Sequence, residues 1–132
     1  MQMLKAQIEY WNNSAEDNWK TALVLFNNKR YDACLFFCHL AIEKKLKGLM
    51  VIKTKETAPY IHNLERLAHL ANLELTKEQI NNLKIITSFN IAGRYDDEKL
   101  AFYKKCTKEY AEKNLQICKT IFLWLKEKYP KN

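Results

Sequence analysis

The chain has 132 residues, 48% of them hydrophobic, and a formal net charge of +7. This length is typical of one domain, so we expect residues 1–132 to form a single domain. Two glycines and two prolines in the whole chain argue against a β fold, which needs turn residues at short intervals. We find no secretory signal and no apolar run of the roughly 18 residues that a membrane span requires. The expectation is a cytoplasmic protein with no membrane contact, whose four cysteines are reduced.

The first half of the chain predicts two long helices. Apolar residues recur every three or four positions from about Leu4 to Asn28, which is typical of one helix face. A second helix is predicted from Tyr31 to Lys53. Its segment Ala33–Ile42 is apolar on nearly all sides, so it is either the central helix of a bundle or also buries a face in a dimer. After this segment the pattern becomes amphipathic, and Lys44, Lys45 and Lys47 are expected on the wetter side.

The second half predicts a loop over Lys53–His62 and then three further helices. They run from about Asn63 to Asn72, from Thr76 to near Gly93, and from about Thr107 to Tyr129. Asn63 is a plausible N-cap, and Thr76 with Gln79 has the spacing of a capping box. The predicted fold is therefore all-α, an antiparallel up-and-down bundle of about five helices, four main ones and a short one.

The positive charge is concentrated in two regions. Residues 41–55 carry five lysines against Glu43, and residues 98–132 carry nine lysines against four glutamates. Such surfaces favour partners that bear phosphate, although lysine-rich helices are also common solubility devices. Only three of the 22 basic residues are arginines, which argues against a sequence-specific DNA binder.

Three segments, taken in order, resemble the HEPN family (higher eukaryote and prokaryote nucleotide-binding domains). They are residues 31–47 (YDACLFFCHLAIEKKLK), residues 62–67 (HNLERL) and residues 89–97 (FNIAGRYDD). The first is similar to the family's second helix, the second to its His-[Asn/Asp]-Leu motif, and the third to its Tyr-Asn-Ile-x-[Ala/Gly]-Arg-Tyr-Pro-Asp pattern. The resemblance covers roughly residues 10–125.

The resemblance implies a bundle of about five helices and two kinds of function. Some HEPN members are RNA-cleaving toxins or defence proteins, often paired with a nucleotidyltransferase encoded nearby. Other members bind nucleotides or serve as non-catalytic partner domains, and many form homodimers. For this chain the resemblance implies a homodimer, with a nucleotide or RNA ligand, a nucleotidyltransferase partner, or both.

The ribonuclease members use an Arg-x4–6-His motif, in which histidine supplies a general base and arginine a cation for the phosphorane. Arg94 is present, but the positions at this spacing hold Lys99, Leu100 and Ala101. The other two arginines also lack a histidine at this spacing. We therefore expect a non-catalytic module without a cofactor. A ribonuclease that recruits His62 from elsewhere in the fold, and a purely structural dimeric subunit, remain alternatives.

The predicted site binds a phosphate or nucleotide. Its residues are Arg94, Tyr95, Asp96, Lys44, Lys47, Glu43 and His62. Each has a structural alternative: Arg94 could pair with Asp96, Asp97 or Glu43, Glu43 and Lys47 could form an i,i+4 helix pair, and His62 could pack at the start of the next helix.

A metal site at Cys34, Cys38 and His39 is the weaker interpretation of these residues. Tetrahedral zinc needs further ligands, and the sequence holds no second Cys/His pair. We expect the two cysteines to pack as small apolar residues, and His39 to be a buried or interface histidine with its polar atoms satisfied.

Overall fold

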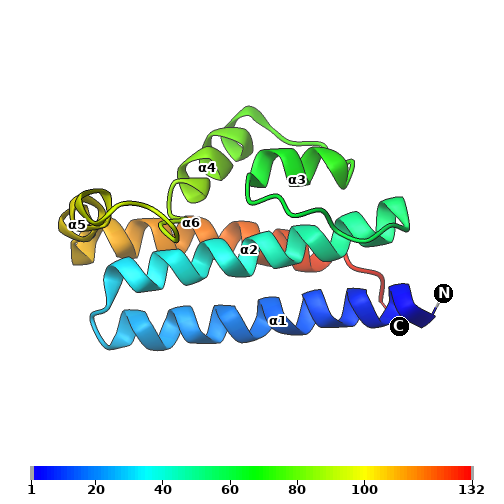
Figure 1. Ribbon diagram of the computed structural model, residues 1–132, viewed down its shortest axis with the longest axis horizontal. Coiled ribbons are helices and arrows are strands. Elements are labelled where there is room, and N and C mark those ends of the chain that lie inside the picture. The colour runs from blue at the N-terminus through cyan, green and yellow to red at the C-terminus, as the bar shows by residue number, and fades with distance from the viewer. Residues whose placement is uncertain (1, 132) are drawn as a thin grey trace.

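The computed structural model describes residues 2–131, and Figure 1 shows that they form helices and no strand. The helices are α1 (Gln2–Asn27), α2 (Tyr31–Thr54), α3 (Leu64–Leu70), α4 (Lys77–Thr87), α5 (Asp96–Lys105) and α6 (Lys108–Glu127). The predicted all-α bundle is confirmed, with six helices in this part of the chain instead of about five.

Helices α1 and α2 form a long antiparallel hairpin (Figure 1). The turn between them is tight. Lys29 adopts a left-handed backbone with φ of 61°, and the Arg30 amide donates to the Leu25 carbonyl at 2.8 Å. The apolar stripe predicted for α1 packs on α2, with Ala15 and Ala22 fully buried. Small residues at these positions let the two helices approach closely.

Helix α2 is the centre of the molecule, as its apolar sequence predicted. It packs against every other helix. Cys34 and Cys38 are buried in the core together with Cys118 of α6, and all three thiols are free. Hydrogen bonds between neighbouring thiols, together with burial, raise the pKa of the Cys34 and Cys38 thiols, which keeps them protonated. These cysteines therefore serve as small apolar residues of the core.

The two helices above α2 begin with the predicted caps. The Asn63 side chain accepts from the Arg66 amide at 3.0 Å, and Thr76 and Gln79 form a reciprocal capping box at the start of α4. Helix α4 ends at Thr87, whereas the sequence had placed its end near Gly93. The chain instead leaves the helix in a series of turns, and Gly93 adopts a φ of 78° that glycine tolerates readily.

Helix α5 was not predicted from the sequence. Its apolar periodicity is weak, because Phe102 is its only buried residue. Another local signal was present: acidic residues fill its first turn, and Lys104 and Lys105 its last, as the helix dipole favours. The Tyr95–Asp97 stretch, predicted to follow a helix end, lies at the start of this helix instead.

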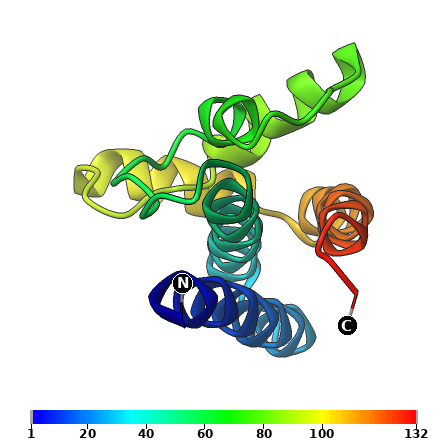
Figure 2. The ribbon, with the colours of Figure 1, turned by 90° about the vertical axis from the view of Figure 1, so that its right-hand side faces the viewer.

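Helix α6 runs in the same direction as α2, with the chain brought back by α3, α4 and α5 (Figures 1 and 2). Thr107 caps its first turn. The helix ends at Glu127, slightly before the predicted end, and Tyr129 then folds back onto α2. Its hydroxyl donates to the Lys45 carbonyl at 2.7 Å. The hydroxyl fits at this position because Gly48 has no side chain.

Among residues 2–131, none of the helices combines the length and the apolar character that crossing a membrane demands.

Candidate ligand-binding site

The carboxylate of Glu43 is the centre of a buried polar cluster. Lys47 Nζ lies 2.9 Å from its Oε2, and His62 Nδ1 lies 3.0 Å from its Oε1. Glu43 and Lys47 are both buried, while the His62 side chain is 42% exposed. The structure therefore brings together three of the predicted site residues: Glu43 and Lys47 on α2, and His62 in the loop before α3.

His39 completes this cluster from the preceding turn of α2. Its Nε2 lies 3.2 Å from the His62 carbonyl and 3.7 Å from Glu43 Oε1. Burial lowers the pKa of His39, outweighing the opposite effect of Glu43, so the ring is neutral near pH 7. A neutral ring can donate to the carbonyl only if Nε2 carries the proton. The other nitrogen, Nδ1, is then buried without a hydrogen-bond donor.

The lysines of α2 are more enclosed than the sequence suggested. Lys44 is half-buried and its amine donates to Ser14 Oγ on α1 at 2.7 Å. Lys45 is only 1% exposed. Its amine lies 2.6 Å from Glu16 Oε2 and 2.5 Å from Asn12 Oδ1, and 5.0 Å from the ring centroid of Phe122. The expectation that Lys45 and Lys47 lie on the wet side was therefore wrong.

Arg94, Tyr95 and Asp96 lie elsewhere, in the connection from α4 to α5 and at the start of α5. Arg94 is partly exposed, and no ion pair found within residues 2–131 involves it. The pairing of Arg94 with Asp96, Asp97 or Glu43, which the sequence left open, is thus not formed in the described chain. Tyr95 is 80% exposed. In the part of the chain described, no side-chain hydrogen bond or ion pair connects this group with the Glu43 cluster.

Sequence reasoning missed Tyr60, which lies next to the cluster. Its ring is 91% exposed and meets the His62 ring edge-on, with 4.8 Å between centroids. The only signal in the sequence was an aromatic residue two positions before a histidine, in a loop otherwise rich in polar residues. Exposure cannot be inferred from this spacing, because it depends on how the loop packs on the rest of the fold.

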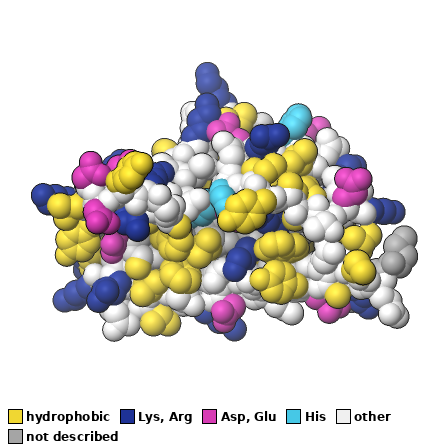
Figure 3. Space-filling model, in the orientation of Figure 1, with side chains coloured by type: hydrophobic (Ala, Val, Ile, Leu, Met, Phe, Trp, Pro, Cys, Tyr) yellow, Lys and Arg dark blue, Asp and Glu magenta, His cyan; other side chains and the backbone are white. Residues whose placement is uncertain are grey.

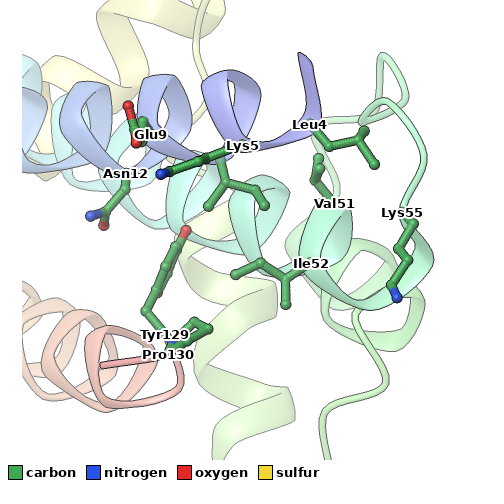
Figure 4. Close-up of a pocket in the computed structure, with 10 residues that line it drawn as sticks. Leu4, Lys5, Glu9, Asn12, Val51, Ile52, Lys55, Tyr129 and Pro130 are labelled. Carbon is green, nitrogen blue, oxygen red and sulfur yellow. The ribbon is translucent and has the colours of Figure 1, made fainter. Parts of the chain in front are cut away.

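A separate cavity of about 630 Å³ lies between the first half of α1, the end of α2 and the C-terminal segment. Figure 4 shows Tyr129 and Pro130 on one side of it, Lys55 on the other, and Ile52 between them. None of the predicted ligand residues lines this cavity. Within residues 2–131, no three His, Cys, Asp or Glu side chains are grouped closely enough to hold a metal ion.

The comparisons with known proteins agree with the helical fold. A family model described as "HEPN domain" matches residues 8–128. Since this match covers most of the chain, the protein belongs to the HEPN domain family.

Among solved structures, the protein TT1696 from Thermus thermophilus has a similar fold. The TM-score is 0.76 at 23% sequence identity, over 93% of this chain and 98% of the other. At this identity the likeness concerns the fold. No curated protein matches the chain.

Proposed function

We propose that this protein is a non-catalytic HEPN module that binds the phosphate of a nucleotide or of RNA through Arg94. The observation that carries the proposal is the state of Arg94, which lies in the connection from α4 to α5, is partly exposed and lacks a carboxylate partner within residues 2–131. A guanidinium in this state can donate two parallel hydrogen bonds to a phosphate. The net charge of +7 adds long-range attraction for such a ligand.

The chain offers a matched control for this assignment. Arg66 on α3 is also exposed, and its side chain forms no ion pair in the described residues. We expect Arg94→Ala to weaken binding of ATP, GTP or a short RNA by roughly tenfold, because a hydrogen bond to a charged group is worth about 1.5–3 kcal/mol. Arg66→Ala should bind like the wild type.

Isothermal titration at two salt concentrations measures the affinity of each protein for the ligand. The affinity of Arg94→Ala should depend less steeply on salt than that of the wild type. Equal affinity in Arg94→Ala and wild type, or no binding by either, would remove Arg94 from the site.

The proposal includes a homodimer formed through α2. Four residues at i, i+3, i+4 and i+7 on this helix are only half-buried, although three are large and apolar: Ala33, Phe36, Phe37 and Leu40. A stripe of this composition on the central helix of a bundle suits a second copy of the same surface.

We also propose a cytoplasmic location and a nucleotidyltransferase as partner. The free, buried cysteines support the first of these. Family membership supports the second. A stable complex in size-exclusion chromatography with a nucleotidyltransferase encoded beside this gene is the expected result, and separate elution of the two proteins would contradict it.

A second candidate function, RNA cleavage, is favoured by one observation. Glu43 is hydrogen-bonded to Nδ1 of His62. The other ring nitrogen, Nε2, belongs to a partly exposed side chain and can face a ligand. A carboxylate-oriented histidine is the arrangement of a general base. Here Nε2 would accept the proton of an RNA 2′-hydroxyl, the 2′-oxygen would bond to phosphorus, and the departing 5′-oxygen would take a proton from water.

Incubation of labelled RNA with the wild type and with His62→Ala separates the two functions. A 2′,3′-cyclic phosphate product that disappears in His62→Ala would establish cleavage. Intact RNA with wild-type protein that binds it would establish the non-catalytic module.

A further inference from the structure

Tyr60 is the most exposed of the large hydrophobic side chains in the described chain. It belongs to the loop between α2 and α3. This loop is tied to α1 by a hydrogen bond from Gln7 Nε2 to Thr57 Oγ1 at 3.3 Å, and to α2 by the bond between His39 and the His62 carbonyl. The ring is thus presented to solvent on an anchored segment.

Charged and aromatic groups lie on the inner side of this ring. Lys47 Nζ is 6.0 Å from the centroid of the Tyr60 ring and 5.3 Å from that of Trp11. Because Lys47 is buried and Tyr60 is almost fully exposed, the cation lies inward and leaves the outer face of the tyrosine uncovered. The His62 ring, fixed by Glu43, borders the tyrosine edge-on.

Near the middle of the face shown in Figure 3, a histidine side chain lies next to hydrophobic and basic side chains. The groups found beside the Tyr60 ring are the His62 ring and the Lys47 amine, so the ring is bordered by polar side chains. A protein partner would be expected to need a larger apolar area.

We propose that Tyr60 is a stacking platform for a nucleobase, with His62 at its edge as a hydrogen-bonding group. A planar base matches one exposed ring, since every base presents a π-face of similar size to an aromatic side chain. Nε2 of His62 can hydrogen-bond to a base edge or a ribose hydroxyl. The base belongs to a free nucleotide or to single-stranded RNA, because the chemistry of stacking is the same in both.

This inference rests on the proposed function, since it assigns the base of the ligand whose phosphate is bound by Arg94. The test uses three probes: ATP, an oligoadenylate RNA and inorganic tripolyphosphate, which has charge but no base. We expect Tyr60→Ala to weaken binding of ATP and of the RNA roughly tenfold, and to leave tripolyphosphate binding unchanged. Tyr60→Phe should bind like the wild type because it keeps the ring.

Tyr103→Ala is the matched control, because Tyr103 is an exposed tyrosine on α5. It should bind all probes like the wild type. An effect of Tyr60→Ala on the RNA alone would assign the base to RNA, and an effect on both base-bearing probes would assign it to the nucleotide unit itself.

The outcomes also separate this inference from the assignment of Arg94. If Tyr60→Ala binds ATP and the RNA as tightly as the wild type while Arg94→Ala loses tripolyphosphate, the stacking platform is overturned and the phosphate site stands. If Tyr60→Ala loses ATP selectively while Arg94→Ala loses nothing, the platform stands and Arg94 is excluded. Equal loss of tripolyphosphate and ATP in Tyr60→Ala, or no binding of any probe by the wild type, overturns the platform.

Discussion

At the scale of single residues, the polar groups of α2 are unusual because they are buried in pairs and clusters. Glu43 is satisfied by Lys47 and His62, and Lys45 by Asn12 and Glu16 of α1. A buried charge is tolerated only when it has partners of this kind, and removal of one partner is costlier than replacement of the pair. The cluster around Glu43 therefore constrains the loop that carries His62.

His39 makes the stability of the protein depend on pH. Burial lowers the pKa of His39 in the folded state below its ordinary value of 6.5. As the pH falls below about 6.5, the unfolded chain takes up a proton that the folded protein does not, so the unfolded state is favoured. We expect the free energy of unfolding to fall between pH 7 and pH 5 by up to about 1.4 kcal/mol per pH unit from this residue.

The variant His39→Gln tests the assignment, since glutamine can donate to the His62 carbonyl but does not titrate. Urea unfolding at several pH values should give a flatter profile for the variant than for the wild type. Glu16 affects stability in a lower pH range, because its pKa in the folded protein is lowered from 4.5. The same slope in both proteins between pH 7 and pH 5 would show that His39 is not the titrating group.

At the scale of helices, the contact between α2 and the segment after α6 depends on Gly48. A Cβ atom at this position would collide with the Tyr129 hydroxyl. Glycine in a helix interior costs about 1 kcal/mol relative to alanine, so the helix alone would favour Gly48→Ala. The packing of Tyr129 opposes this preference. In Gly48→Ala the tyrosine would lose its hydrogen bond to the Lys45 carbonyl and part of its burial.

These opposing effects predict that the stability change caused by Gly48→Ala has opposite signs with and without the Tyr129 side chain. In the wild-type background we expect Gly48→Ala to destabilise the protein by about 1–2 kcal/mol. In the Tyr129→Ala background the same substitution should stabilise it by up to about 1 kcal/mol. Chemical denaturation of the four proteins measures the cycle, and an equal effect of Gly48→Ala in both backgrounds would exclude the steric coupling.

At the scale of the whole molecule, the half-buried stripe on α2 predicts the oligomeric state. We expect light scattering at micromolar concentration to report a dimer for the wild type and a monomer for Leu40→Glu, because the substitution places a charge in the apolar interface. Val24→Glu on the exposed part of α1 is the control and should leave the dimer intact. A wild-type monomer under these conditions would contradict the proposed homodimer.

Much of the fold could be predicted because its signals are local. The 3.6-residue periodicity of α1 and α6 and the capping residues Asn63 and Thr76 each act within a few residues of chain, and all of them appear in the structure. Helix α5 was missed because it presents only Phe102 to the core, and its charge pattern is a weaker signal than an apolar stripe.

The helical class, the central place of α2 and the resemblance to the HEPN domain could all be predicted, because hydrophobic periodicity, capping chemistry and motifs are properties of neighbouring residues. The enclosure of the lysines of α2 and the exposure of Tyr60 follow instead from tertiary contacts. The burial of Lys45 depends on rings and carboxylates from α1 and the C-terminal part of the chain, and the exposure of Tyr60 depends on how its loop is anchored to α1 and α2. Such contacts join residues far apart in sequence, so spacing along the chain does not encode them.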